Sequence, residues 1–301
     1  MIELRSVSKT FGTHHALTNI DMTVSTGSIY GLVGTNGSGK TTILNILAGV
    51  LRPDSGSVVY DGSPVYENPA VKSAMVFVPD DLSFLNGFTL KQAAKLFSGL
   101  YAGKWNDDLF SVCVTQFKLD CNMQIAHMSK GMRKQAMFCL SFARKPSYML
   151  LDEPIDGLDP IVRRSIWELI VDAAADRGMT TVVSSHNLRE LEGYCDSICA
   201  IKQGQVVVER DLDELKSDIH KLQISFGAAG QQSADIYDSL DVLDKRDSGS
   251  VDYLIVRNSA EELDDFARRT QPILFDKIPL TLEEIFMYQL GGNGNEHTSI
   301  L

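Results

Sequence analysis

The 301-residue sequence lacks any long apolar run, and no window reaches the ~18 uninterrupted apolar residues that a membrane-spanning helix needs. Its first residues, MIELRSVSKTFG, also lack a basic start followed by an apolar block, which is the pattern of an export signal. We therefore expect that the chain neither spans a membrane nor leaves the cytoplasm by itself.

Paired cysteines are lacking as well. The five cysteines are odd in number and none forms a C-x₂-C pair, so they indicate reduced, buried thiols in a cytosolic protein. Cys195 and Cys199 are only weak candidates for metal ligands.

Positive charge is scarce, since 28 Lys and Arg stand against 39 Asp and Glu for a formal net charge of −11. This balance argues against a broad surface for nucleic acid or an anionic membrane, although it does not exclude a local patch. An apolar content of 44% and a charged content of 22% predict a folded chain with room for one large domain and a small one. We expect no nucleic-acid partner.

Glycine, in contrast, is concentrated in the stretch GLVGTNGSGKTTILNILAG. The spacing G-x-x-x-x-G-K-[ST] is met by Gly34, Gly39, Lys40 and Thr41, between a strand-like run and a segment with helical periodicity. Glycines allow positive φ and close approach to a ligand, and N–H groups at a helix start attract anions. The stretch therefore predicts a polyphosphate site rather than an ordinary glycine-rich turn.

The side chains of this loop have distinct expected roles. Lys40 is expected to bridge the β- and γ-phosphates, the Thr41 hydroxyl to hold Mg²⁺, and Thr42 to reach the α-phosphate. Because no internal repeat is present, the chain carries one such loop.

Strand-like and helical segments alternate along the chain, which predicts an α/β fold with a parallel sheet covered by helices on both faces. Apolar residues at helical spacing indicate a helical insertion, and further helices are expected at 161–178 and 187–195. Beyond about residue 213 we expect a small α/β domain, with a polar stretch rich in Gly, Ser and Gln. The predicted domains are 1–212 (with the insertion at about 84–143), 213–290, and a flexible tail at 291–301.

Two adjacent carboxylates, Asp152 and Glu153, end the apolar strand YMLLDEP. Parallel strands direct their C-terminal ends toward the ligand crevice. Asp152 is expected to hold Mg²⁺ through water, opposite Thr41, and Glu153 to orient or deprotonate the water that attacks the γ-phosphate. A DE pair alone is more often a solvated strand end, but the phosphate loop favours the functional interpretation.

With these motifs in order over residues 1–212, the chain resembles the ATP-binding subunit of an ATP-binding-cassette (ABC) transporter. The resemblance implies a P-loop NTPase fold with a RecA-like parallel core, an N-terminal antiparallel β subdomain, a helical insertion and a small C-terminal α/β appendage. It also implies ATP and Mg²⁺ as cofactors. The loop residues that match the ATP-binding loop are Gly34, Thr35, Asn36, Gly37, Ser38, Gly39, Lys40, Thr41 and Thr42.

The resemblance assigns further roles. Phe11 is similar to the aromatic residue that stacks on adenine, and His186 to the switch histidine that contacts the γ-phosphate. Asp159, in GLDP, is similar to the acid of a loop that crosses to the partner subunit. Without the family context, Phe11 is more often a core residue and His186 a satisfied polar residue.

The family's signature segment corresponds to MSKGM, residues 128–132. Ser129 is a good N-cap, while Lys130, Arg133 and Lys134 add positive charge where the helix dipole is already positive, so we expect an anion to dock there. In the family, Ser129 and Gly131 would close on ATP held by a second, identical or related ATP-binding subunit. A solvated basic helix start is the alternative.

Two positions depart from the family pattern. Asp80 stands where a glutamine is usual and is expected to face Mg²⁺ or the attacking water. Lys130 replaces the first signature glycine. Similar K-G-M signatures occur in subunits of exporter-type transporters with separate permease chains, which favours export.

The first functional hypothesis is an ATPase that drives a transmembrane permease from the cytoplasmic face of the membrane. The permease would dock in a groove near Asp80 and residues 84–119. Three alternatives are a soluble ABC-type ATPase of DNA repair or translation, a regulatory nucleotide-binding module without turnover, and a kinase or GTPase. The compact insertion disfavours a soluble ATPase of DNA repair or translation. The presence of Glu153 and His186 disfavours a module without turnover, and the signature segment disfavours a kinase or GTPase.

Overall fold

The computed structural model describes residues 1–81, 87–226 and 234–289. The predicted tail at 291–301 and the predicted start of the insertion, near Phe84, lie outside these residues. The chain divides into two compact units. The first unit comprises Met1–Asn187 and Tyr194–Glu209, and the second unit comprises Leu188–Gly193 and the chain from Arg210.

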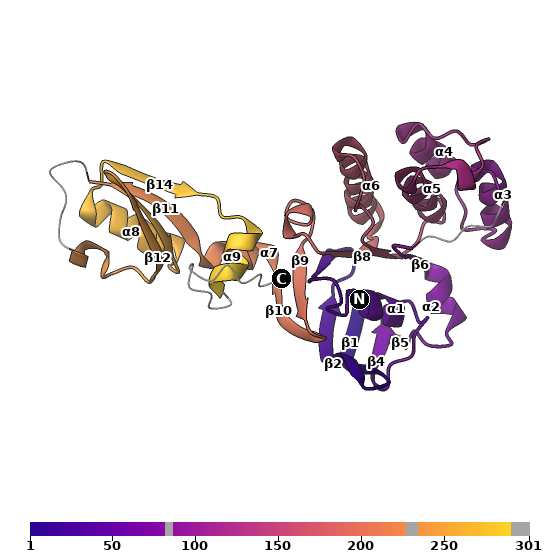
Figure 1. Ribbon diagram of the computed structural model, residues 1–301, viewed down its shortest axis with the longest axis horizontal. Coiled ribbons are helices and arrows are strands. Elements are labelled where there is room, and N and C mark those ends of the chain that lie inside the picture. The colour runs from indigo at the N-terminus through magenta and orange to yellow at the C-terminus, as the bar shows by residue number, and fades with distance from the viewer. Residues whose placement is uncertain (82–86, 227–233, 290–301) are drawn as a thin grey trace. The chain divides into compact units, whose positions relative to one another are not determined.

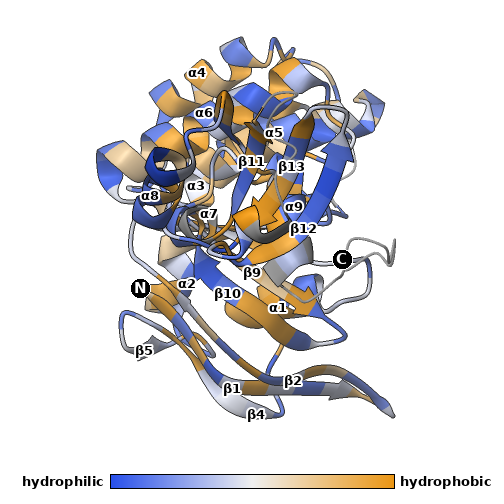
Figure 2. Cartoon of the chain, turned by 90° about the vertical axis from the view of Figure 1, so that its left-hand side faces the viewer, coloured by the Kyte–Doolittle hydropathy of each residue, from blue (hydrophilic) through white to orange (hydrophobic). Residues whose placement is uncertain are grey.

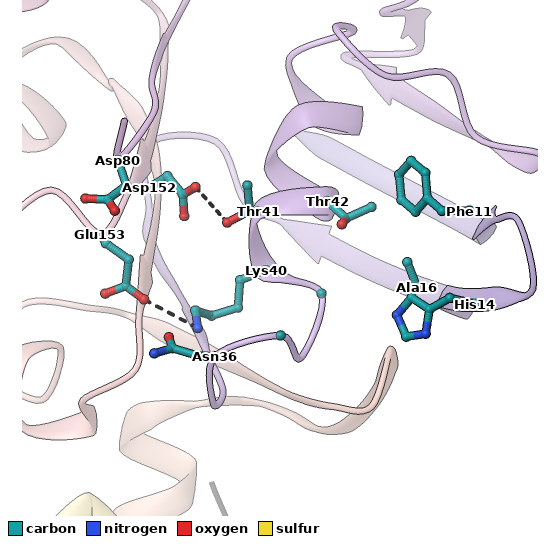
Figure 3. A pocket seen from close by; sticks show the side chains of 12 residues that line it. Phe11, His14, Ala16, Asn36, Lys40, Thr41, Thr42, Asp80, Asp152 and Glu153 are labelled. Atoms are coloured by element: carbon teal, nitrogen blue, oxygen red, sulfur yellow. Dashed lines mark hydrogen bonds and ion pairs between the residues drawn. The ribbon is translucent and has the colours of Figure 1, made fainter. Parts of the chain in front are cut away.

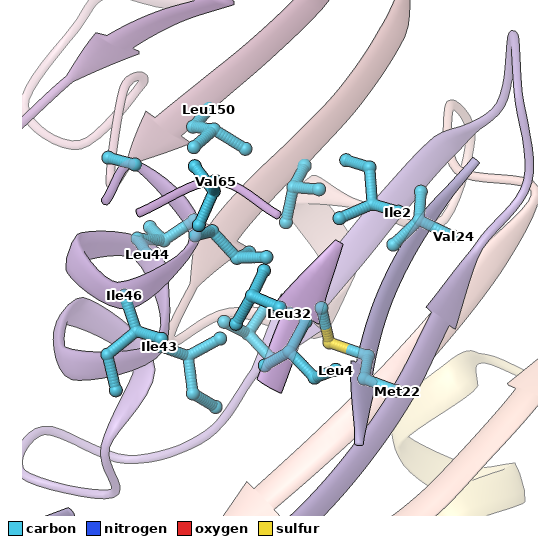
Figure 4. Packing of buried hydrophobic residues seen from close by; sticks show 14 of the residues in the cluster. Ile2, Leu4, Met22, Val24, Leu32, Ile43, Leu44, Ile46, Val65 and Leu150 are labelled. Carbon is cyan, nitrogen blue, oxygen red and sulfur yellow. The ribbon is translucent and has the colours of Figure 1, made fainter. Parts of the chain in front are cut away.

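An antiparallel sheet opens the first unit, with strand order β2-β1-β4-β5. Its inward residues, such as Ile2, Leu4 and Met22, are almost fully buried. They pack against Ile43 and other apolar residues of the helix that follows the glycine-rich loop (Figure 4). The strands are β1 (Ile2–Phe11), β2 (His14–Val24), β4 (Ser55–Tyr60) and β5 (Ser63–Pro64).

A six-stranded sheet forms the centre of the first unit, in the order β10-β9-β3-β8-β7-β6. The pairs among β3 and β6–β9 are parallel, and every residue of β3, β7 and β8 is buried, as expected for strands covered on both faces. Because these strands are parallel, their C-terminal ends meet at one edge. The strands are β3 (Ile29–Val33), β6 (Met75–Val78), β7 (Tyr148–Asp152), β8 (Thr180–Ser185), β9 (Ser197–Lys202) and β10 (Gln205–Asp211).

Figure 1 shows where the helices of the first unit lie, and α2 to α6 among them begin at a residue whose side chain caps the helix. Thr89 forms a capping box with Gln92, Asn106 and Ser129 cap the next two α-helices, and Asp159 caps the helix that begins at Pro160. The helices are α1 (Lys40–Leu47), α2 (Pro69–Ala74), α3 (Leu90–Leu100), α4 (Asp107–Gln116), η1 (Ile125–His127), α5 (Lys130–Phe142) and α6 (Pro160–Arg177).

The second unit contains an antiparallel sheet in the order β12-β13-β11-β14. Helix α8 packs on it through Leu263 and Phe266 and exposes charged residues, so it is mostly blue in Figure 2. The elements are η2 (Leu188–Glu190), α7 (Leu212–Asp218), β11 (His220–Ser225), η3 (Ala234–Tyr237), β12 (Val242–Ser248), β13 (Val251–Val256), α8 (Ala260–Thr270), β14 (Leu274–Ile278) and α9 (Leu282–Gln289).

These elements confirm the predicted α/β class, with a parallel core, an N-terminal antiparallel sheet and a helical insertion made by α3, α4 and α5. The helix predicted at 187–195 is wrong, because only the short η2 forms there. Arg189 and Glu192 instead bind α9, through an ion pair at 2.9 Å and a hydrogen bond at 3.3 Å. No helix in the described part of the chain is long and apolar enough to cross a membrane.

Candidate functional site

A cavity of about 340 Å³ opens where β3 and β7 end. Figure 3 shows Phe11, His14 and Ala16 at one end of it and the acidic side chains at the other. The lining residues are Phe11, His14, Ala16, Asn36, Gly37, Gly39, Lys40, Thr41, Thr42, Asp80, Asp152 and Glu153.

The glycine-rich loop between β3 and α1 forms one wall of this cavity. Gly37 and Gly39 have φ values of 81° and 115°, which other residues rarely adopt. Gly34 does not take positive φ, but a Cβ there would lie 2.3 Å from the Ile201 carbonyl oxygen and 2.5 Å from Ser38 Oγ. Glycine is therefore required at position 34 because a side chain would not fit there. It is required at positions 37 and 39 because of their positive φ. The resulting loop presents the N-terminus of α1 to the cavity, which fits an anionic ligand.

Lys40, the first residue of α1, is almost fully buried. Its Nζ donates hydrogen bonds to the carbonyl oxygens of Gly34 at 2.6 Å and Thr35 at 3.3 Å. It also lies 3.4 Å from Glu153 Oε1 (Figure 3). A buried ammonium needs such partners, and these place the positive charge between the loop and the acidic end of the cavity.

Asp152 is buried at the end of β7 and accepts two hydrogen bonds. Thr41 Oγ1 donates to Oδ2 at 2.8 Å, and Ser184 Oγ donates to Oδ1 at 2.6 Å. The hydroxyl and carboxylate of Thr41 and Asp152 are oxygen donors of the kind that Mg²⁺ prefers, so this pair fits the ion.

Ser184 is a site residue that the sequence analysis missed. It lies opposite Asp152 in the β7–β8 pairing, and its hydroxyl also accepts a hydrogen bond from the Glu153 backbone N–H at 3.0 Å. The signal was the pair of serines that ends the buried strand TTVVSS, but only the strand order identifies the neighbour of Ser184.

Glu153 has a φ of 45°, in the left-handed region, which costs roughly 1–3 kcal/mol for a non-glycine residue. Its carboxylate lies between two groups: Oε1 faces Lys40, and Oε2 is 2.9 Å from His186 Nδ1. The structure therefore brings together Lys40, Glu153 and His186. This arrangement holds a carboxylate in a defined orientation at the cavity, as activation of a water molecule requires.

The aromatic end of the cavity contains Phe11, whose side chain is 49% exposed although it is a large apolar group. The Nζ of Lys9 lies 5.7 Å from the centre of its ring. An exposed ring at the cavity mouth fits the stacking of a planar base. His14 and Ala16 line the same end and were not predicted, because no motif marks them.

Ser129, Gly131 and Asp159 are not among the described residues that line the cavity. Ser129 caps α5 by accepting a hydrogen bond from Met132 N at 3.2 Å, and Asp159 caps α6. A Cβ on Gly131 would lie 3.3 Å from Leu158, so the signature segment and the GLDP loop pack together. Their roles toward ATP on another subunit stay predictions.

The positive charge at the start of α5 differs from expectation. Lys134 is 5% exposed, and its Nζ donates to the carbonyl oxygens of Glu153 at 2.7 Å and Asp156 at 3.2 Å. The same Nζ lies 2.8 Å from Asp80 Oδ1. The prediction that Lys134 helps to bind an external anion is therefore wrong, because Glu153, Asp156 and Asp80 of the same chain already bind its ammonium group. Lys130 and Arg133 are both exposed at this helix start, and Arg133 Nε donates to the Met128 carbonyl oxygen at 3.0 Å.

The two weak metal-ligand candidates are buried thiols. Burial raises the pKa of Cys199 to about 12 and that of Cys195 further. Since metals bind the thiolate, these pKa values disfavour metal binding at neutral pH.

The chain is similar to several known proteins. The family model described as "ABC transporter" matches residues 17–156. The chain is 32% identical over 292 residues to the ABC transporter ATP-binding protein YtrB of Bacillus subtilis (strain 168), covering 97% of this chain and 99% of that protein. It is 32% identical over 214 residues to the Nod factor export ATP-binding protein I of Burkholderia lata, covering 69% and 70% of the two chains.

Among solved structures, one described as the ATP-binding subunit of an ABC transporter superposes with a TM-score of 0.66 at 25% identity. The match covers 72% of this chain and 92% of that chain.

Proposed function

This chain belongs to the ATP-binding proteins of ABC transporters, and on that premise we propose that it is an ATPase subunit that drives a separate transmembrane permease. The observation that carries the proposal is the convergence of the phosphate loop with two carboxylates and a histidine. Lys40, Glu153 and His186 form one connected set, and Thr41 and Asp152 form another beside it.

The residues of this cavity divide the work of hydrolysis. The loop amides and Lys40 bind the β- and γ-phosphates, and Phe11 stacks on the base. Mg²⁺, when held by Thr41 and Asp152, neutralises charge on the phosphate oxygens. Glu153 accepts a proton from the attacking water, and His186 keeps its carboxylate oriented through the bond at 2.9 Å.

A second ATP-binding subunit, identical or related, completes the site in this proposal. Ser129, Gly131 and Asp159 lie outside the lining of the cavity in their own chain. Gly131 lies against Leu158, the residue before Asp159, so the start of α5 and the GLDP loop lie side by side. A two-fold arrangement would place both segments over ATP on the partner.

The permease is proposed to dock on the helical insertion. Leu100 on α3 and Val112 on α4 are 66% and 52% exposed, although both are large apolar residues. Exposed apolar residues mark partner sites when they form a patch. The chain would then lie peripherally at the cytoplasmic face of the membrane. The K-G-M signature and the export function in the name of the Burkholderia lata relative support export.

The Glu153→Gln variant tests the proposal. Because glutamine cannot accept the proton, steady-state ATP hydrolysis should fall at least ~100-fold. ATP affinity should persist, and the variant should accumulate an ATP-dependent dimer in size-exclusion chromatography. Glu261→Gln, the same change at an exposed position on α8, is the control and should match the wild type. Unchanged hydrolysis in Glu153→Gln would remove Glu153 from the mechanism.

A further inference from the structure

We propose that Lys134 is a positioning residue for ATP hydrolysis, which acts through the backbone of Glu153 and the carboxylate of Asp80. The inference rests on the proposed ATPase function. It concerns a lysine in α5 that does not line the cavity but binds two of the residues that do.

The ammonium group of Lys134 makes two hydrogen bonds and one ion pair. Its Nζ donates to the carbonyl oxygens of Glu153 at 2.7 Å and Asp156 at 3.2 Å. It also forms an ion pair with Asp80, whose Oδ1 lies 2.8 Å away. Since the side chain is 5% exposed, these contacts replace hydration. Lys134 is therefore held by three points of its own chain.

Two of these contacts, the hydrogen bonds to the Glu153 and Asp156 carbonyl oxygens, stabilise the turn after β7. Glu153 and Asp156 begin and end the turn, and the Asp156 N–H also donates to the Glu153 carbonyl at 3.4 Å. Glu153 has positive φ, so its backbone needs support from its surroundings. Lys134 binds the carbonyl of this residue and thereby fixes the direction in which its carboxylate leaves the backbone.

That direction matters because the Glu153 carboxylate has two partners on different elements. Oε1 lies 3.4 Å from Lys40 on α1, and Oε2 lies 2.9 Å from His186 after β8. A small rotation of the Glu153 backbone would lengthen one contact or both. Displacements of about 1 Å can cost on the order of 100-fold in rate.

The third contact of Lys134 is the ion pair with Asp80, a residue that follows β6 and lines the cavity. Lys134 therefore also holds this carboxylate in position. One ammonium on α5 thus sets the positions of two carboxyl-bearing residues at the acidic end. Because α5 belongs to the helical insertion, the placement of Glu153 depends on the placement of that helix.

The experiment compares Lys134→Met with Lys95→Met, the same change at an exposed position on α3. Hydrolysis and the affinity for a fluorescent ATP analogue are measured for each purified chain. Lys134→Met should lower kcat roughly 10- to 100-fold. ATP affinity should stay within about twofold of wild type, because Lys134 touches no loop residue that binds phosphate. Lys95→Met should match wild type.

A second comparison separates positioning from a general loss of structure. Adding Lys134→Met to Glu153→Gln should lower the residual rate of hydrolysis far less than Lys134→Met lowers the wild-type rate, because Glu153 is one of the two residues through which Lys134 acts. If Lys134→Met does not fold, Lys134→Gln, whose amide keeps N–H donors, undergoes the same two comparisons.

Three results would overturn the inference: wild-type kcat in the Lys134 variant, a parallel loss of ATP affinity, or a loss in the double variant as large as the loss that Lys134→Met causes in the wild type. A wild-type chain that binds but never hydrolyses ATP would instead refute the proposed function, and the inference with it.

Discussion

The two units of the chain build their sheets differently. In the first unit, β3, β7 and β8 are parallel and end at one edge, where residues 34–42, 152–153 and 186 meet. In the second unit all pairs are antiparallel, so neighbouring strands end at opposite edges. A parallel sheet therefore collects side chains that are distant in sequence at one edge, whereas an antiparallel sheet distributes the strand ends between two edges.

The relatives cover different shares of the chain. The solved structure described above covers 72% of it, and the Burkholderia lata relative 69%. The Bacillus subtilis relative covers 97%, so the match to it extends into the second unit.

The largest expected contrast is between two lysines that each pair with a glutamate. Lys40 lies 3.4 Å from Glu153, and Lys221 lies 2.7 Å from Glu284 in the second unit. Lys40→Ala should lower ATP turnover by roughly 100-fold or more, because it removes the cation that binds phosphate. Lys221→Ala should leave turnover unchanged. ATP hydrolysis assays measure both, and equal turnover in the two variants would contradict the assignment of the site.

A second contrast concerns exposed apolar residues. Leu100 on the insertion is 66% exposed, and Ile273 in the second unit is 78% exposed. Leu100→Asp should release the chain from membranes that contain its permease while ATP binding stays unchanged, because a charge disrupts apolar docking. Ile273→Asp should leave the chain bound.

Membrane fractionation with the permease gene present and deleted provides the measurement. If the wild-type chain stays soluble in both cases, or binds lipid vesicles alone, a soluble ABC-type ATPase becomes the better account.

The smallest effect concerns alkaline stability, and it can be tested in each unit on a tyrosine that is hydrogen-bonded to an aspartate. Burial and hydrogen bonds to Asp61 and Asp244 raise the pKa values of Tyr148 and Tyr288 to about 12. A raised tyrosine pKa means that the folded state favours the protonated form, so this stabilisation is complete below the unfolded pKa of about 10 and is lost as pH rises toward 12.

Tyr288→Phe should therefore reduce the fall in melting temperature of the second unit between about pH 10 and pH 12. Tyr148→Phe should do the same for the first unit only. Circular dichroism melts at each pH provide the test, and an unchanged pH dependence in both variants would show that neither tyrosine contributes.

Local signals account for most of what could be predicted. The helix boundaries of α5 and α8 follow from the N-caps Ser129 and Ser259, and the buried strands follow from apolar runs. Strand β12 was missed because most of its residues are charged and exposed, as is common at a sheet edge, and only its pairing with β13 makes it a strand.

The sequence by itself determined the phosphate loop, the two carboxylates of β7 and the fold class, because each depends on spacing and periodicity within a short segment. Only the tertiary structure decided how Ser184 and Lys134 are used. Ser184 meets Asp152 because β8 lies beside β7, and Lys134 binds Glu153 and Asp80 because α5 buries it there. Burial and strand order are properties of the whole fold. The sequence therefore predicts an exposed charge at Lys134, whereas the fold buries it in contact with residues of the site.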